Sequence, residues 1–266
     1  MKKRSWVHPL LMVLLMIYLL SPLAATLLYS LAGEWQTTVL PEYWTLHWFA
    51  DMLQDPRFTG ALLRTLLVCT VTVVLSMLVM LPTIFIVTVY FPRFERLLNA
   101  LVLLPYAIPP VVAAVGLIKI YSSGPIVISG TVWILIGGYF VSILPYMYQG
   151  IRNSLRTIHA VELLDAAELL GASKIQAFRH VVFPNILPGI MVSMLLSFSV
   201  LFGEFVLANL LVGGHFPTIQ IYLYQRLSES GHLASAIAIT YFIVVLLVSG
   251  VLLKLSKWFF RAPRLG

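Results

Sequence analysis

The stretch that decides the fold is Asp165–Gly189, "DAAELLGASKIQAFRHVVFPNILPG", a partly charged, helix-forming segment in a chain that is 60% hydrophobic. Apolar residues around its start recur at helical spacing, which predicts one helix over residues 153–171, ended by Gly171. A second helix is predicted to begin after Ser173 as its cap and to end at Pro184. Two short helices joined at a glycine form a compact knob, either a docking surface or a self-contained helical hairpin.

The rest of the chain is too apolar for an ordinary soluble domain. Its 266 residues have a mean hydropathy of +0.96, and 10% of them are charged. The apolar residues come in blocks of about 20 or more, the length that a helix needs to cross a bilayer. We therefore predict an all-α membrane protein with six transmembrane helices, at Pro9–Ala32, Ala61–Tyr90, Leu97–Tyr121, Thr131–Gly150, Ile186–Leu211 and Leu233–Leu255.

The first apolar block could instead be a cleaved signal peptide. Its apolar run continues through "SPLAATLLYSLA", residues 21–32, well beyond the ~7–15 residues of a signal's apolar region. An uncleaved first span is the better interpretation.

The distribution of positive charge predicts the orientation. With the N-terminus inside, 13 of the 17 Lys and Arg residues fall on the inner side, as the positive-inside rule requires. Both termini and the loop 151–185 are then cytoplasmic. The net charge of +7 reflects topology, so we expect no nucleic-acid partner.

The outer segment 33–60 is rich in aromatic residues, which favour the headgroup layer. Leu46, Phe49 and Leu53 recur at helical spacing, and the sequence "DPRF" ends the pattern. We predict a short interfacial helix, with an aromatic ligand cage as the alternative.

Proline distinguishes the third span. Pro105, Pro109 and Pro110 lie inside a membrane-length segment, where each removes a backbone hydrogen bond, so this helix must kink or break. The break is either purely structural or borders a polar passage. In the fourth span, Gly137 and Gly138 allow close packing of helices.

The knob carries a family resemblance. Asp165-Ala166-Ala167, followed by Gly171 and, thirteen residues on, by Pro184, resembles the "EAA" loop of ABC importer permeases, the membrane subunits of binding-protein-dependent uptake systems. Asp165 stands where the family usually has Glu. Residues 202–227, "FGEFVLANLLVGGHFPTIQIYLYQRL", resemble the polyamine, ferric-iron and 2-aminoethylphosphonate branch.

The resemblance implies a type I importer transmembrane domain covering residues 1–266 in a bacterial inner membrane. Its implied partners are two cytoplasmic ATPase subunits, a second permease of different sequence and an extracytoplasmic solute-binding protein. The residues expected to couple to the ATPases are Asp165, Ala166, Ala167, Gly171, Ala172, Phe178 and Pro184.

Motifs for catalysis are missing from the sequence. It has no phosphate-binding loop with lysine, no nucleophile elbow and no cysteine pair, and its six histidines lie at span edges or in loops. We expect no enzyme activity, no cofactor and no metal. An ion-coupled secondary carrier and a membrane scaffold are the alternatives to a permease.

Glu204 is the one acidic residue clearly inside a predicted span. A carboxylate there should face protein or water rather than lipid. It either makes hydrogen bonds that lock helices together or lines the translocation pathway, where it would help an amine-bearing solute such as a polyamine to pass. We also assign Asn209, Pro109 and Tyr146 to the pathway; ferric iron and phosphonates remain alternative substrates.

Overall fold

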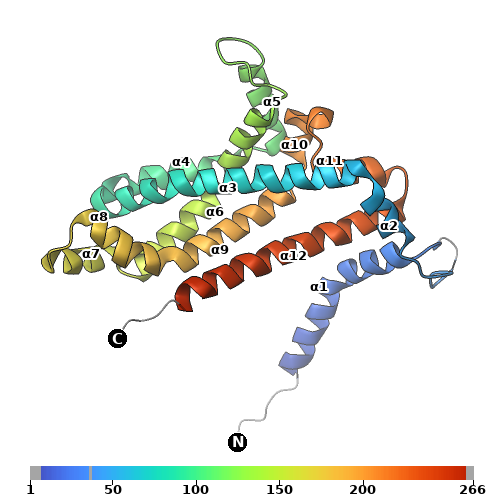
Figure 1. Cartoon of the computed structure of the whole chain (residues 1–266), viewed down its shortest axis with the longest axis horizontal. Coiled ribbons are helices and arrows are strands. Elements are labelled where there is room, and N and C mark those ends of the chain that lie inside the picture. The colour runs from blue at the N-terminus through green and yellow to red at the C-terminus, as the bar shows by residue number, and fades with distance from the viewer. Residues whose placement is uncertain (1–6, 36–37, 262–266) are drawn as a thin grey trace, which may run out of the picture. The chain divides into compact units, whose positions relative to one another are not determined.

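The computed structural model describes residues 7–35 and 38–261, with side chains described for residues 8–35 and 38–254. Lys2, Lys3, Arg4 and Arg264, which the predicted orientation uses, lie outside the described residues. The regular secondary structure of the described residues is helical, apart from one isolated bridge between Ala32 and Trp44. Figure 1 shows its elements, which are α1 (Val7–Leu31), α2 (His47–Gln54), α3 (Pro56–Tyr90), η1 (Pro92–Phe94), α4 (Glu95–Ala107), α5 (Pro110–Tyr121), α6 (Val132–Thr157), α7 (Ala160–Leu169), α8 (Lys174–Ala177), η2 (Phe178–Val182), α9 (Phe183–Phe202), α10 (Val206–Leu211), η3 (Gly213–His215), α11 (Ile219–Leu227) and α12 (Gly231–Arg261).

Five helical segments in the described part are long and apolar enough to cross a membrane. They are His8–Leu31, Pro56–Tyr90, Val132–Thr157, Lys174–Phe202 and Gly231–Lys254. The pair Pro92–Ala107 and Pro110–Tyr121 makes a sixth if the two helices form one broken span. The chain is thus an all-α membrane protein with five candidate spans, or with the predicted six if this pair is one span. The short helix expected in the segment 33–60 is α2.

The third span breaks where the prolines predict. The axes of the helices on either side of the break differ by 100°, and α5 turns steeply away from α4 in Figure 1. Ile108 and Pro109 have ψ angles of 118° and 137°, outside the helical region. Each of these residues precedes a proline, whose ring disfavours the helical conformation of its predecessor. The dipeptide Pro109-Pro110 therefore enforces the break, whereas Pro105 is accommodated inside α4.

The fifth span is not the continuous helix predicted from Ile186 to Leu211. α9 ends at Phe202 and α10 begins only at Val206. Gly203 takes part in the intervening bend, and Glu204 accepts backbone N–H groups there through its side chain. A carboxylate that binds main-chain N–H groups offers an alternative to the helical hydrogen bonds, so the helix restarts after it.

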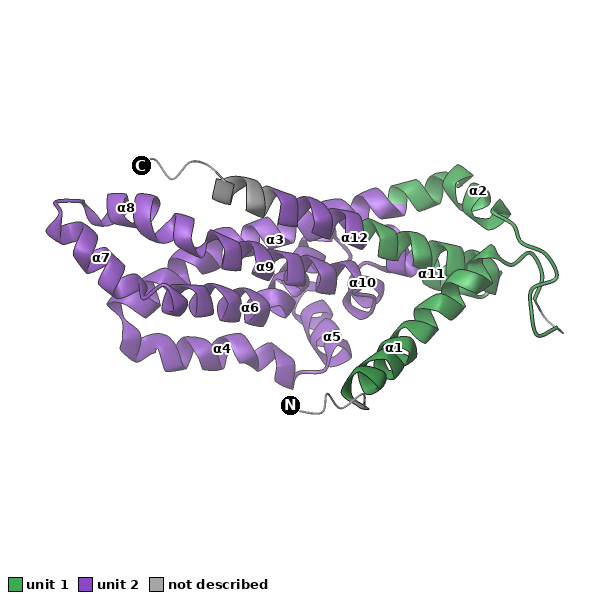
Figure 2. Cartoon of the chain, turned by 90° about the horizontal axis from the view of Figure 1, so that it is seen from below, with its two compact units in different colours: residues 1–60, 222–244 green, residues 61–221, 245–266 purple. Residues whose placement is uncertain are grey.

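The chain divides into two compact units, coloured separately in Figure 2. Unit 1 contains residues 1–60 and 222–244, and unit 2 contains residues 61–221 and 245–266. Within unit 1, the indole N–H of Trp48 donates to the carbonyl of Ala32 (2.9 Å), which ties α2 to the end of α1. The core of unit 2 runs along one face of α6, formed by Tyr139, Ile143, Met147, Ile151 and Leu155, all of which are at most 1% exposed.

Two small-residue pairs set the contact between α6 and α9, which lie side by side in Figures 1 and 2. Gly150 of α6 faces Ser193 of α9, and Gly189 of α9 faces Ser154 of α6. Each serine hydroxyl donates to the carbonyl of the glycine on its own helix, Ser154 to Gly150 (2.7 Å) and Ser193 to Gly189 (2.8 Å). Small residues at such a crossing allow two backbones to approach closely.

This crossing predicts the effect of adding one methyl group. A Cβ atom at Gly150 would lie 2.8 Å from the Cβ of Ser193 and closer still to its hydroxyl. We expect Gly150→Ala to lower the free energy of unfolding in mixed micelles by about 1–3 kcal/mol, the usual cost of overpacking. Gly137→Ala is the matched control, because nothing lies within 4 Å of a Cβ at that position of the same helix. Equal stability of the two variants would contradict the close approach.

Candidate functional site

The knob, defined here as residues 160–182, connects α6 to α9. Figure 1 shows α7 and α8 beyond the ends of these two helices. Gly171 ends α7 with a φ angle of +88°. The N–H of Gly171 bonds to Glu168 O (2.9 Å) and that of Ala172 bonds to Ala167 O (3.1 Å). This is the paired pattern of a Schellman C-cap, which favours glycine at the left-handed position, as the sequence predicted.

Ser173 starts the second half of the knob, again as predicted. Its hydroxyl accepts the N–H of Gln176 (3.4 Å), and its own N–H donates to Gln176 Oε1 (2.9 Å). These reciprocal bonds form a capping box. The turn between α7 and α8 is therefore defined on both sides by backbone hydrogen bonds.

Pro184 does not end the second helix, contrary to the prediction. A helical path runs from Lys174 to Phe202, and residues Phe178–Val182 form a π turn just before the proline. There the N–H of Phe183 bonds to the carbonyl of Phe178, five residues back. Proline lacks an N–H and crowds the carbonyl four residues before it. The wider π turn shifts the hydrogen-bond register, so the helix continues into the span.

The single helix predicted over residues 153–171 is also wrong. α6 runs on to Thr157, and His159 then adopts a left-handed conformation (φ 51°, ψ 55°) before α7 begins. Leu155, Ala160 and Leu164 are all buried. In one continuous helix the step of five residues from Leu155 to Ala160 would turn them to different faces. The break redirects the apolar stripe of α7 toward the core.

The predicted coupling residues differ in exposure. Asp165, Ala166, Gly171 and Pro184 are exposed, Ala172 and Phe178 are half-buried, and Ala167 is buried. The ring of Phe178 lies 4.5 Å from that of Phe85 on α3, centroid to centroid. Ala167 and Phe178 thus hold the knob to its own chain, whereas Asp165 and Ala166 face outward.

Sequence reasoning missed the most exposed apolar side chains of the knob. Leu169 and Leu170 are each 89% exposed, and Ile175 is 79% exposed. They flank the Gly171 turn, next to the exposed acids Asp165 and Glu168. The sequence signal for them was the run of apolar residues beside Gly171, where α7 ends.

The four predicted pathway residues do not form one cluster of side-chain contacts. Glu204 caps α10, since its two carboxylate oxygens accept the N–H groups of Leu207 (2.8 Å) and Ala208 (3.1 Å). The side chain of Glu204 thus makes hydrogen bonds, but with the start of α10 a few residues ahead rather than between two packed helices. Asn209 and Pro109 are exposed, on α10 and at the start of α5, two helices that pack together. Tyr146 makes an edge contact with Tyr106 of α4 (6.0 Å between centroids).

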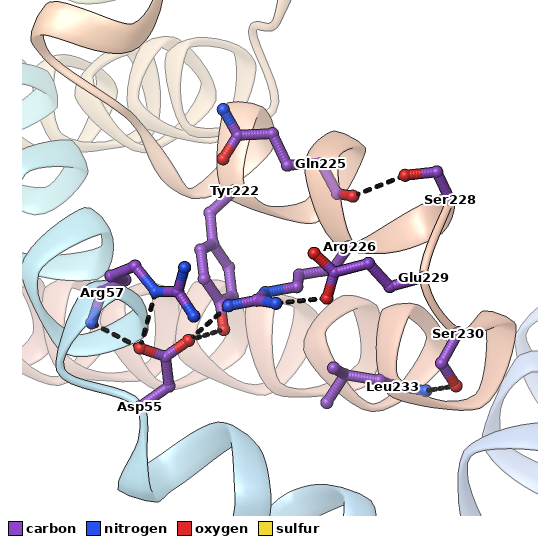
Figure 3. A network of polar contacts seen from close by, with 9 residues as sticks. All are labelled: Asp55, Arg57, Tyr222, Gln225, Arg226, Ser228, Glu229, Ser230 and Leu233. Carbon is purple, nitrogen blue, oxygen red and sulfur yellow. Dashed lines mark hydrogen bonds and ion pairs between the residues drawn. The ribbon is translucent and has the colours of Figure 1, made fainter.

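A second polar cluster, the Asp55 clamp, lies in unit 1 and is shown in Figure 3. Asp55 Oδ1 accepts the backbone N–H (2.9 Å) and the Nε–H (3.1 Å) of Arg57. Its Oδ2 accepts Nη2–H of Arg226 (2.7 Å) and the hydroxyl of Tyr222 (2.9 Å). Arg226 also pairs with Glu229 and lies over the Tyr222 ring. One carboxylate therefore caps α3 and binds α11.

The environment of Asp55 favours its charged form. Burial opposes ionisation, but the hydrogen bonds from Arg57 and Tyr222 outweigh it and lower the pKa of Asp55 to about 2. The side chains of Asp55 and Arg226 are only 15% and 12% exposed, so the ion pair is largely shielded from solvent.

Among the described residues, no group of three or more His, Cys, Asp and Glu side chains could hold a metal ion. Cys69, the single cysteine of the sequence, is buried and free. The described polar clusters join helices to one another through caps and ion pairs.

Comparison with known proteins identifies the family. Residues 81–261 match the model of the "Binding-protein-dependent transport system inner membrane component". The chain belongs to this family. It is therefore a multi-pass inner-membrane permease of an ABC importer, without catalytic activity of its own, and ATP hydrolysis belongs to a separate subunit. The family also rules out the alternative of an ion-coupled secondary carrier.

Two relatives from Salmonella typhimurium (strain LT2) illustrate the similarity. The chain is 29% identical over 254 residues to the protein named "Putative 2-aminoethylphosphonate transport system permease protein PhnV", covering 96% of this chain and 93% of the relative. It is 29% identical over 216 residues to the "Sulfate transport system permease protein CysT", covering 73% and 74% of the two chains.

Solved structures show the same fold. A chain of a bacterial ABC transporter that imports the acidic polysaccharide alginate matches with a TM-score of 0.72 and 17% identity, over 96% of each chain. A chain of the methionine ABC transporter MetNI, in an inward-facing conformation, matches with a TM-score of 0.63 and 18% identity, over 77% of this chain and 99% of that one. The fold is thus similar to the transmembrane domains of type I ABC importers.

The C-cap of α7 predicts a residue-specific response. Gly171→Val places a β-branched residue at a φ of +88°, which costs about 1–3 kcal/mol. Gly171→Asn is the matched control, because Asn visits the left-handed region far more readily. We expect faster amide hydrogen exchange across residues 160–177 in the Val variant alone, with insertion into the membrane unchanged. Equal exchange in the two variants would show that the cap does not hold the knob.

The Asp55 clamp predicts a pH-dependent stability. Its folded pKa of about 2 lies below the ordinary value of ~3.9 for aspartate. The stabilisation is therefore complete above about pH 5 and is lost as the pH falls toward 2. Asp55→Asn removes the charge that Arg57 and Arg226 contact, while Arg226 keeps its pairing with Glu229. We therefore expect a loss of about 2–3 kcal/mol at pH 7, the size that such a pKa shift implies, and this loss shrinks in acid.

Asp51→Asn serves as the control for this measurement, because Asp51 is more exposed and its ion pair is with the exposed His47. Unfolding free energies in mixed micelles, compared at pH 7 and pH 3, provide the test. A constant difference between Asp55→Asn and the wild type would contradict the role of the charge.

Proposed function

We propose that this chain is the translocating subunit of an importer for a small amine-bearing phosphonate, and that its knob docks onto a cytoplasmic ATPase subunit. The docking role is supported by two features of the knob, its ordered turn and its exposed apolar side chains. Its turn is defined by a Schellman cap and a capping box, yet it exposes Leu169, Leu170 and Ile175. Exposed apolar side chains on a rigid support are typical of a protein interface.

The proposed orientation places the knob inside the cell. Positive charges favour the side that holds the loop 151–185 and both termini. Between the knob and Asp55 the chain runs through α6, the α4–α5 pair and α3, three crossings if that pair is one broken span. Between the knob and Arg226 it crosses once, through α9. We therefore assign the segment 33–60, which contains Asp55, to the outer side of the membrane.

The proposed assembly follows the family's division of labour. Two ATPase subunits contact two permease subunits from the cytoplasm, and a solute-binding protein delivers the solute from outside. The similarity to a phosphonate permease supports a second permease chain of different sequence. In this assembly, Asp165, Ala166 and Gly171 face the ATPase, while Ala167 and Phe178 hold the knob together from within.

The substrate proposal rests on the relatives rather than on Glu204. The two curated relatives described above are named for 2-aminoethylphosphonate and sulfate, whereas the sequence had favoured a polyamine. The relative covered over nearly its whole length is the 2-aminoethylphosphonate permease, which favours that alternative. Both oxygens of Glu204 accept backbone N–H groups, so this carboxylate is committed to the fold.

The docking role is tested by cross-linking in a Cys69→Ala background. We expect Ala166→Cys to cross-link to the co-expressed ATPase subunit and to be protected from reagents added outside the cell. Ala167→Cys is the matched neighbour, and we expect little cross-linking because that side chain is 8% exposed. Labelling of Ala166→Cys from outside would overturn both the orientation and the docking role.

The substrate is tested with the reconstituted complex and its binding protein. We expect 2-aminoethylphosphonate to stimulate ATP hydrolysis, and spermidine and sulfate to leave it at its basal rate.

The role of Glu204 is tested by two variants. Glu204→Ala should reduce uptake, because losing a helix cap costs about 0.5–2 kcal/mol. Glu204→Gln retains one acceptor oxygen and should transport better than Glu204→Ala. Stimulation by spermidine, or a Gln variant as impaired as Ala, would favour the original pathway hypothesis for Glu204.

A further inference from the structure

The turn between α3 and α4 combines exposed rings with exposed cations. This basic turn, residues 90–96, has the sequence "YFPRFER". Tyr90 is 39% exposed, and Phe91 and Phe94 are each 50% exposed. Arg93 and Arg96 are exposed as well. Exposed rings and exposed cations thus lie together within seven residues.

The one acid of the turn does not neutralise these arginines. Glu95 turns inward, where its carboxylate accepts hydrogen bonds from Arg152 and from Arg156 (3.0 and 3.2 Å) on α6. Two guanidinium groups thus share one carboxylate. Neither Arg93 nor Arg96 forms an ion pair within the described residues. The turn therefore carries an excess of positive charge.

The knob adds a third cation. The ammonium group of Lys174, at the start of α8, lies 5.1 Å from the centre of the Tyr90 ring. Lys174 is exposed and has no ion-pair partner among the described residues. The aromatic end of α3 thus joins the cations of the turn to the cation of the knob.

The basic turn lies between two apolar segments, and this location indicates which molecules it contacts. α3 contains a span-length apolar segment that ends at Tyr90, and α4 begins the next one at Glu95. The turn therefore lies where hydrocarbon gives way to headgroups. Aromatic rings favour that depth, and basic clusters next to a span attract anionic lipids.

We propose that the basic turn binds the headgroup of an anionic phospholipid. Arg93 and Arg96 pair with its phosphate, Lys174 adds a third positive charge from the knob, and the rings of Phe91 and Phe94 insert beside the acyl chains. The bound lipid would contact both α3 and α8, so it would stabilise the packing of the knob against the end of α3. The proposal does not depend on the transported solute.

The test measures lipid selectivity by electron spin resonance. The purified chain is reconstituted in phosphatidylcholine vesicles with spin-labelled phosphatidylglycerol or spin-labelled phosphatidylcholine. We expect the wild type to select phosphatidylglycerol, less so at high salt because screening weakens the attraction. Arg93→Gln and Arg96→Gln should each lower the relative association constant by up to about fivefold.

Two comparisons make the result specific. Lys119→Gln removes one exposed charge from the end of α5, and it should leave the selectivity unchanged. The double variant Arg93→Lys/Arg96→Lys keeps the charge and should keep most of the selectivity. Selectivity that persists in Arg93→Gln/Arg96→Gln, or that falls equally in Lys119→Gln, overturns the proposal. So does an equal loss in the double lysine variant, which would indicate damage to the turn rather than loss of its charge.

Discussion

The close approach of α6 and α9 is the contact on which the functional geometry depends. These helices are the two stems of the knob, and Gly150 and Gly189 let them meet almost backbone to backbone. The hydroxyls of the serines opposite, Ser154 and Ser193, donate to the carbonyl of the glycine on their own helix. The core residues of α6 are buried along the same helix.

Irregular backbone elsewhere in the chain is satisfied by side chains. In hydrocarbon an unpaired N–H or C=O group is costly, so each break needs its own partners. Glu204 supplies two acceptors where α10 restarts, and Asp55 supplies one where α3 begins. At Pro109-Pro110 the missing donors belong to proline itself. At these three places the sequence either removes a donor or adds an acceptor.

The sequence predicted the features that local chemistry determines. The proline break, the left-handed Gly171 and the capping box at Ser173 all follow from residues next to the event. The errors arose where tertiary packing decides. His159 turns left-handed so that Leu155 and Leu164 can both be buried, and no local residue signals it. Likewise, the π turn before Pro184 lets the helix continue into α9, although the proline predicted that it would end.

The candidate site was predictable in place but not in detail. Spacing located the knob, yet it could not separate the outward Ala166 from the inward Ala167, since adjacent helical residues differ by about 100°. Glu204 was singled out correctly as a carboxylate that needs partners. Its partners turned out to be main-chain groups three and four residues ahead, which a continuous helix would not have offered.

The Asp55 clamp has a consequence for how the chain is made. Its bonds to Arg57 join residues two apart, whereas its bond to Arg226 joins residues 171 apart. During synthesis the local cap can form as soon as α3 emerges, but the guanidinium from α11 arrives only when most of the protein exists. Until then the carboxylate keeps one oxygen open to water. The joint between α2 and α3 is thus completed late, after the intervening spans have had time to insert.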